Sequence, residues 1–196
     1  GSPRTEPTSF AQVEPLLRED TFVGLLRRLV AQSQHLQNQP KQGLVAEERR
    51  AATVVQDELM CFLAKYGGPL EMEELAVQPG RTNLKVSYNP PEACSTVAFV
   101  THFDVLPPCE EAEHKQRRDP FKLARAGDAL YGCGTSANLG HVALLTQLLC
   151  TLGQHRPALR CKVVVLFLAA FQGGEAGLGA DWLLEQQKLE DMRMGP

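Results

Sequence analysis

The chain has 196 residues, of which 43% are hydrophobic and 22% charged, which is enough for one globular domain with a substantial core. Its net charge of −3 and the lack of any basic cluster argue against a nucleic-acid-binding surface. No apolar run reaches the roughly 18 residues that a membrane-spanning helix needs, so we expect no membrane partner.

The start of the chain, Gly1-Ser2-Pro3, is typical of residues left behind by an expression tag, and no signal peptide follows it. We expect residues 1–8 to be disordered and residues 9–196 to form a single α/β domain. The six cysteines lack the CxxC spacing of a metal site or a disulfide framework. This pattern indicates reduced, mostly buried thiols and a cytoplasmic protein.

Two amphipathic helices are expected first. The earlier one starts near Phe10, with Ser9 as a possible cap, and buries apolar residues that recur at helical spacing. After a surface loop at 34–43, the second helix runs over 46–66 and stops at a pair of glycines. Its acidic residues, Glu47 and Glu48, are interpreted as solvated surface.

Strands follow at 70–77 and 83–88, and then a β-branched and aromatic run at 96–102 predicts a central strand buried on both faces. This run delivers His102 and Asp104 to its carboxyl end. In open α/β sheets ligands bind at the carboxyl ends of strands, so we expect the function of the protein to lie there.

A glycine-rich stretch at 131–140 leads into a helix at 141–152, and an apolar strand at 161–171 precedes a last helix. The stretch is neither GxGxxG nor a P-loop and has no lysine for a phosphate, so a phosphate site is not predicted. The order of elements predicts a mixed, largely parallel sheet flanked by helices, with strand 96–102 beside strand 161–171.

Five short motifs occur in an order that resembles the first half of the catalytic domain of the zinc aminoacylase and carboxypeptidase family. That family includes acetylornithine deacetylase, succinyl-diaminopimelate desuccinylase and aminoacylase. The motifs are Gly80-Arg81-Thr82-Asn83-Leu84, Thr101-His102-Phe103-Asp104-Val105-Leu106-Pro107, Asp119-Pro120-Phe121, Leu130-Tyr131-Gly132-Cys133-Gly134 and Gly177-Leu178-Gly179-Ala180. The resemblance implies a zinc-exopeptidase-like fold.

The resemblance also implies a chemistry, in which a water held between two zinc ions hydrolyses an amide with a glutamate as general base. By motif position, His102 resembles a zinc ligand and Asp104 the carboxylate that orients it. Their i, i+2 spacing places both side chains on one face of a strand. Judged without the resemblance, a lone His-x-Asp is more often a hydrogen-bonded pair than a metal site.

The remaining positions depart from the family pattern. Ala137 stands where the family has the aspartate that bridges the two metals, and Gln172-Gly173-Gly174-Glu175 stands where it has an acidic triplet. Only Glu175 could serve there as a catalytic carboxylate; otherwise it is an acid in the first turn of the last helix. Cys133, in place of the motif's arginine, and His141 could in principle rebuild a zinc site.

Two hypotheses follow. The first is a non-catalytic descendant without a cofactor that keeps the sheet as a scaffold or interaction domain, and Ala137 together with Gly173-Gly174 favours it. The alternative is a divergent, zinc-dependent hydrolase of N-acyl amino acids or peptides, truncated here. The resemblance implies that a lid and dimerisation domain is absent, which would leave a sheet edge uncovered. We therefore expect a homodimer or a protein partner at that edge.

Overall fold

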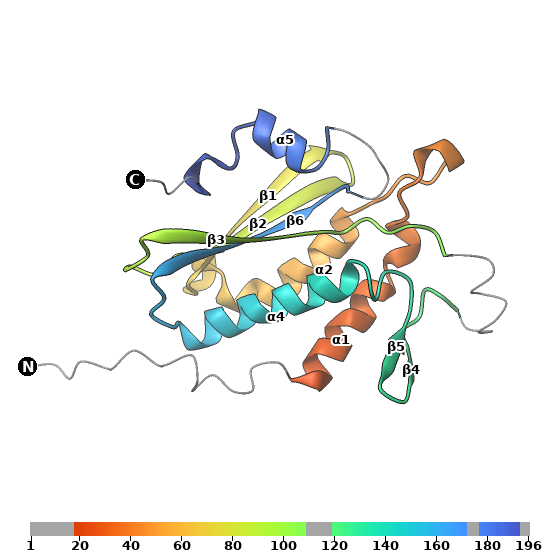
Figure 1. Ribbon diagram of the computed structural model, residues 1–196, viewed down its shortest axis with the longest axis horizontal. Coiled ribbons are helices and arrows are strands. Elements are labelled where there is room, and N and C mark those ends of the chain that lie inside the picture. Colours follow the sequence, from red (N-terminus) through yellow and green to blue (C-terminus); the bar gives the residue numbers. More distant parts are fainter. Residues whose placement is uncertain (1–17, 109–118, 172–176, 193–196) are drawn as a thin grey trace, which may run out of the picture.

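A four-stranded sheet separates two layers of helices in the computed structural model (Figure 1), which describes residues 18–108, 119–171 and 177–192. The strand order is β1-β2-β6-β3. The strands are β1 (Leu70–Gln78), β2 (Arg81–Tyr88), β3 (Ser95–His102) and β6 (Cys161–Leu168). The predicted α/β class with a mixed sheet is confirmed. In the described sheet only β3 and β6 run parallel, while the β1–β2 and β2–β6 pairs are antiparallel, so parallel pairing is less extensive than predicted.

The core lies on both sides of β6, because successive side chains of a strand point to opposite faces. One set of its residues packs with the larger helical layer: Val163, Val165 and Phe167. The other set packs beneath the short helix α5 (Ala180–Glu185): Val164, Leu166 and Leu168. Burial on both faces explains why the strand is an uninterrupted apolar run.

The larger layer contains α1 (Glu19–Val30), α2 (Arg49–Leu59) and α4 (Leu139–His155), which lie together on one face of the sheet in Figure 1. Ser9 and Phe10, the predicted start of the first helix, lie outside the described residues. In the structure α1 begins at Glu19, with acids in its first turn and arginines in its last, which suits the helix dipole.

The second helix is shorter than predicted. It ends at Leu59 and is followed by two 3₁₀ turns, Met60–Phe62 and Ala64–Tyr66. Leu63 between them is extended (φ −76°, ψ 145°), and this breaks the helical path although the apolar pattern continues. Gly67, at φ 86°, closes the segment in the left-handed region that favours glycine.

Within the described sheet, residues 96–102 do not form the predicted central strand. β3 lies beside β6, as expected, but it forms an edge of the described sheet. Ser95 and residues 97–100 are exposed, and only Thr101 is buried. The apolar run therefore forms a surface that no described strand or helix covers.

Two further features concern the periphery. A small hairpin of β4 (Ala124–Ala126) and β5 (Ala129–Tyr131) stands apart from the main sheet, near the start of α1 (Figure 1). The five described cysteines are free, but Cys61 and Cys94 are exposed, so the thiols are less buried than predicted.

Within the described residues, no helix combines the length and the apolarity needed to cross a bilayer.

Candidate active site

His102 and Asp104 meet at the carboxyl end of β3, as the i, i+2 spacing predicts. The Nδ1 atom of His102 lies 2.8 Å from Oδ1 of Asp104. The aspartate side chain is fully buried, whereas the histidine side chain is 13% exposed. With Nδ1–H directed at the carboxylate, the neutral ring keeps its lone pair on Nε2, from which it could bind a metal ion.

Asp104 is held by donors from three parts of the chain. Besides His102, Asn38 Nδ2 donates to Oδ2 (3.1 Å) and the backbone N–H of Phe171 donates to Oδ1 (3.0 Å). Burial alone would raise the pKa of Asp104, but these hydrogen bonds outweigh it and hold the pKa below its ordinary value. The carboxylate therefore stays ionised and orients His102, and it is a poor proton acceptor for a substrate.

Asn138, at the start of α4, fixes the same strand end from the other side. Its Nδ2 donates to the carbonyl oxygens of His102 (3.2 Å) and Asp104 (2.6 Å). The Oδ1 atoms of Asn38 and Asn138 are both buried, and neither has a hydrogen-bond partner within the described part of the chain. Both asparagines were missed at the sequence level, because their partners lie 66 and 34 residues away and leave no local pattern.

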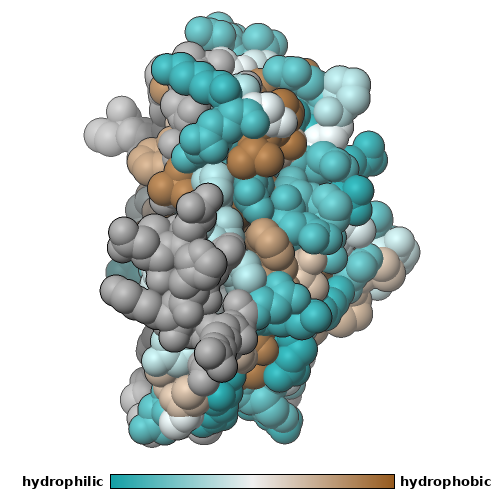
Figure 2. All heavy atoms as spheres, turned by 90° about the vertical axis from the view of Figure 1, so that its right-hand side faces the viewer, coloured by the Kyte–Doolittle hydropathy of each residue, from teal (hydrophilic) through white to brown (hydrophobic). Residues whose placement is uncertain are grey.

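The exposed side of the pair is aromatic. Phe171 stacks on the His102 ring, with ring centroids 5.1 Å apart and planes at 28°, and its own side chain is 72% exposed. Figure 2 views the molecule from the side towards which the carboxyl ends of β3 and β6 run in Figure 1. The described surface there is mainly hydrophilic, with separate hydrophobic patches.

The described residues around His102 do not by themselves supply the ligands of a two-zinc centre. Ala137 is exposed on the loop before α4 and offers no ligand atom. Cys133 lies with Sγ 3.5 Å from the carbonyl oxygen of Leu106, and burial raises the pKa of its thiol, so the zinc-binding thiolate is disfavoured. His141 is exposed on α4. Within residues 18–108, 119–171 and 177–192, no three potential ligands converge. Glu175 and Gly173-Gly174 lie outside the described residues.

A buried ion pair lies close enough to influence the same region. Arg81 on β2 donates from Nε and Nη2 to the two carboxylate oxygens of Glu48, at 2.5 and 2.7 Å. Glu48 is fully buried, so its interpretation as solvated surface was wrong. Burial raises the pKa of Glu48 to about 7, against the lowering effect of Arg81, and the negative charge of Asp104 adds to the rise.

Asn83 links the two sides of the segment that carries Glu175. Its Oδ1 accepts the backbone N–H of Ala169 (2.8 Å), just after β6. Its Nδ2 donates to the carbonyl oxygen of Leu178 (3.0 Å), just before α5. One side chain on β2 therefore holds residues on both sides of residues 172–176.

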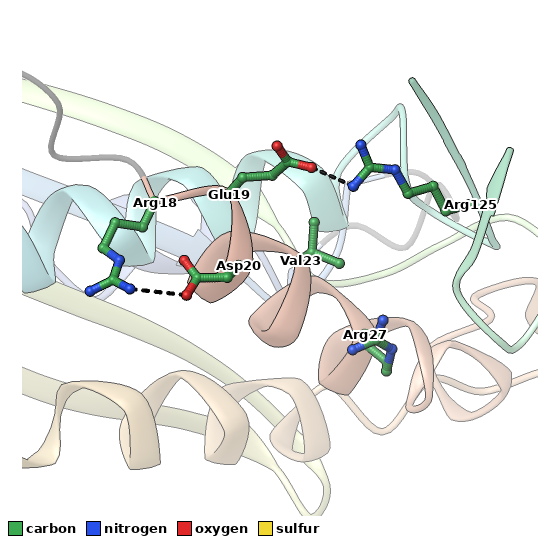
Figure 3. A pocket seen from close by; sticks show the side chains of 6 residues that line it. All are labelled: Arg18, Glu19, Asp20, Val23, Arg27 and Arg125. Carbon is green, nitrogen blue, oxygen red and sulfur yellow. Dashed lines mark hydrogen bonds and ion pairs between the residues drawn. The ribbon is translucent and has the colours of Figure 1, made fainter. Parts of the chain in front are cut away.

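A surface pocket of about 710 Å³ lies elsewhere, between the start of α1 and the small hairpin (Figure 3). Its charges are largely paired within the pocket: Arg18 with Asp20 at 3.1 Å, and Arg125 with Glu19. Val23 and Arg27 complete the lining. Neither His102 nor Asp104 contributes to it, so the pocket is separate from the strand-end site.

Solved structures define the class of this fold. The chain superposes on human carnosine dipeptidase 1 with a TM-score of 0.63 and 21% identity, covering 89% of this chain and 36% of that one. For the M20 family metallo-carboxypeptidase Sso-CP2 of Sulfolobus solfataricus the TM-score is 0.64 at 15% identity, covering 88% and 35%. The fold is thus that of the M20 metallopeptidases.

Sequence comparison gives the family itself. Residues 98–195 match the family profile described as Peptidase family M20/M25/M40, and the chain belongs to that family. It is 36% identical over 183 residues to acetylornithine deacetylase of Arabidopsis thaliana and 35% identical over 190 residues to that of Dictyostelium discoideum. Each alignment covers 92% of this chain but only 41% and 42% of the relative. The resemblance drawn from the motifs is confirmed.

Proposed function

We propose that this chain is a non-catalytic member of the M20 family that acts in the cytoplasm as an interaction domain. The observation that carries the proposal is Ala137, which stands at the position of the metal-bridging aspartate in the family's motif. A methyl group cannot coordinate a metal ion, and loss of even an outer-sphere partner weakens metal affinity by roughly 10–100-fold. Loss of a bridging ligand should cost at least as much.

The geometry at the strand end supports this reading. Asp104 already accepts hydrogen bonds from His102, Asn38 and Phe171. Nε2 of His102 is therefore the atom of this pair that could coordinate a metal ion. A catalytic zinc site normally has three protein ligands. The free thiols of the five described cysteines support the cytoplasmic location.

A second candidate is a hydrolase similar to acetylornithine deacetylase. The identity of 36% to such a relative and the retained bond between His102 and Asp104 favour it. In that case His102 would bind zinc, Asp104 would orient the histidine, and Glu175 would act as the general base. Zinc would supply a polarised carbonyl and a hydroxide near neutral pH.

Metal analysis separates the two candidates. Protein purified without chelator should contain no stoichiometric zinc, and it should not hydrolyse N-acetylornithine or other N-acyl amino acids with zinc or cobalt added. His102→Ala is the test variant, and His155→Ala, at an exposed histidine at the end of α4, is the matched control. Two zinc ions per chain, or hydrolysis lost in His102→Ala but retained in His155→Ala, would refute the proposal.

A further inference from the structure

A thiol on α4 lies beside the turn that carries another cysteine at the end of α2. The two helices lie side by side on one face of the sheet (Figure 1). Cys150 of α4 is half-buried, and its Sγ atom lies 4.0 Å from the carbonyl oxygen of Glu58, at the end of α2. A helical carbonyl oxygen points towards the residues three and four positions further on. Cys61 stands three positions after Glu58, so the Cys150 thiol lies against its turn.

Two further observations place the same segments together. The ring of Phe62 packs directly on Gly153 of α4, where an added Cβ would lie 2.6 Å from Cγ of the ring. Gly153 follows Cys150 by three residues and so lies on the same side of the helix. Burial raises the pKa of the Cys150 thiol to about 12, and the charges of Glu58 and Cys61 add to the rise. Because such an effect falls with distance, it agrees with the packing.

The two thiols differ in their access to an oxidant. Cys61 is exposed, whereas Cys150 is half-buried and holds its proton. Oxidants attack thiols that are accessible and can ionise, so Cys61 is the thiol that an oxidant meets first. Cys150 is protected from direct oxidation, but its sulfur lies beside the turn where the oxidised sulfur would form. An exposed thiol with a second thiol beside it is the arrangement of a sensor cysteine and its resolving cysteine.

We propose that hydrogen peroxide joins Cys61 and Cys150 in a reversible disulfide that fastens the end of α2 to α4. The Cys61 thiolate attacks a peroxide oxygen; an S–O bond forms, the O–O bond breaks, and the departing hydroxide takes a proton to become water. The Cys150 thiol then loses its proton and attacks the sulfenic sulfur. An S–S bond forms, the S–O bond breaks, and the departing hydroxide takes that proton. Two thiols are oxidised and one peroxide is reduced to two waters, and a small thiol such as glutathione reverses the bond by exchange.

The backbone around Cys61 suits such a bond. A disulfide needs the two Cα atoms roughly 4.4–6.8 Å apart, and a rigid pair of helices rarely adjusts to this. Here α2 ends at Leu59, Cys61 belongs to a single 3₁₀ turn, and Leu63 is already extended. Cys150, by contrast, lies within the 17-residue helix α4. The short turn can therefore move towards α4, and the bond would depend neither on a metal ion nor on the interaction role proposed above.

Peptide mass mapping of the 196-residue chain tests the proposal. After reduction, removal of the reductant and treatment with hydrogen peroxide, the non-reduced digest should contain a peptide pair linked through Cys61 and Cys150. Dithiothreitol should release it. The linked pair should be absent from Cys61→Ser and from Cys150→Ser. Cys94→Ser is the matched control, because Cys94 is also exposed, and this variant should form the linked pair as the wild type does.

Two measurements on the wild type need no variant to fold. The closing step requires the Cys150 thiolate, so its rate should rise about tenfold per pH unit between about pH 7 and 9. The bond restricts the unfolded chain, so the oxidised protein should melt at a higher temperature than the reduced protein. Thiols that stay free, a sulfinic acid at Cys61 without a link, or a bond to another cysteine would overturn the proposal. A closing rate independent of pH, or a melting temperature that does not rise, would also contradict it.

Discussion

Asn138 donates a 2.6 Å hydrogen bond from Nδ2 to the backbone carbonyl oxygen of Asp104, and so fastens the start of α4 to the end of β3. Asparagine just before a helix usually caps it through its side-chain oxygen. Here that oxygen is buried without a partner among the described residues, and the side chain makes no capping bond. The role of Asn138 is therefore to position the strand end.

The two roles predict different results for Asn138→Asp. Aspartate caps helices as well as asparagine does, but at this position it would point an oxygen at the carbonyl oxygens of His102 and Asp104. We expect Asn138→Asp to lower the free energy of unfolding more than Asn138→Ala, whose cost should be about 1–3 kcal/mol. Urea unfolding measures both, with Ser136→Ala, at an exposed neighbour, as control. An aspartate variant as stable as the wild type would indicate capping.

The lowered pKa of Asp104 predicts a loss of stability in acid. The ordinary carboxyl value is 3.8, and the folded state holds the group below it, so the unfolded state binds more protons as the pH falls. The stabilisation is complete above about pH 5 and disappears as the pH drops through the folded pKa. Urea unfolding between pH 2.5 and 6 should therefore show the advantage of wild type over Asp104→Asn shrinking towards low pH. An advantage that is constant with pH would contradict this.

The buried pair of Glu48 and Arg81 should respond differently from an exposed pair nearby. Arg81→Leu leaves Glu48 buried without its bidentate partner and should cost about 3–5 kcal/mol of unfolding free energy. The double variant Glu48→Leu, Arg81→Leu should lose less than the single one. Arg50 pairs with Glu47 on the surface, and Arg50→Leu should cost no more than about 1 kcal/mol. Additive losses in the double variant would rule out a penalty from an unpaired buried charge.

The link made by Asn83 predicts a local effect after β6. Asn83→Ala removes the acceptor of the Ala169 N–H, and hydrogen exchange at that amide should accelerate. Asn83→Asp keeps this acceptor but loses the donor to Leu178, so protection at Ala169 should persist while the segment before α5 loosens. Amide exchange measured by NMR distinguishes the two variants. Equal protection in wild type and Asn83→Ala would show that the link is dispensable.

The sequence was informative where function and structure depend on neighbouring residues. The period-two strands, the His102–Asp104 spacing and the ordered motifs led to the fold and to the strand-end site. Asn38 and Glu48 were both interpreted as surface, because their partners Asp104 and Arg81 lie 66 and 33 residues away. No local pattern encodes a hydrogen bond across that distance.

The position of β3 in the sheet shows the same limit. The β-branched and aromatic run at 96–102 is compatible with a buried strand and with a strand at a sheet edge, since periodicity reports side-chain type and not what lies beside the strand. In the described sheet the neighbour on one side is β6, and none lies on the other. The position of a strand in a sheet depends on pairing between distant parts of the chain, which a local pattern does not encode.

The strand order also sets a sequence of events during synthesis. β6 is the last described strand to be made, yet it lies between β2 and β3, and its first residue follows that of β3 by 66 positions. At a synthesis rate of about 5–20 residues per second, β6 begins to emerge roughly 3–13 seconds after β3. β1 and β2, which are consecutive in the chain, can form a hairpin at once. During that interval the apolar residues Val97, Phe99 and Val100, which lie in a segment without charged residues, lack their β6 neighbour, so this part of the nascent chain is open to aggregation or to capture by a chaperone.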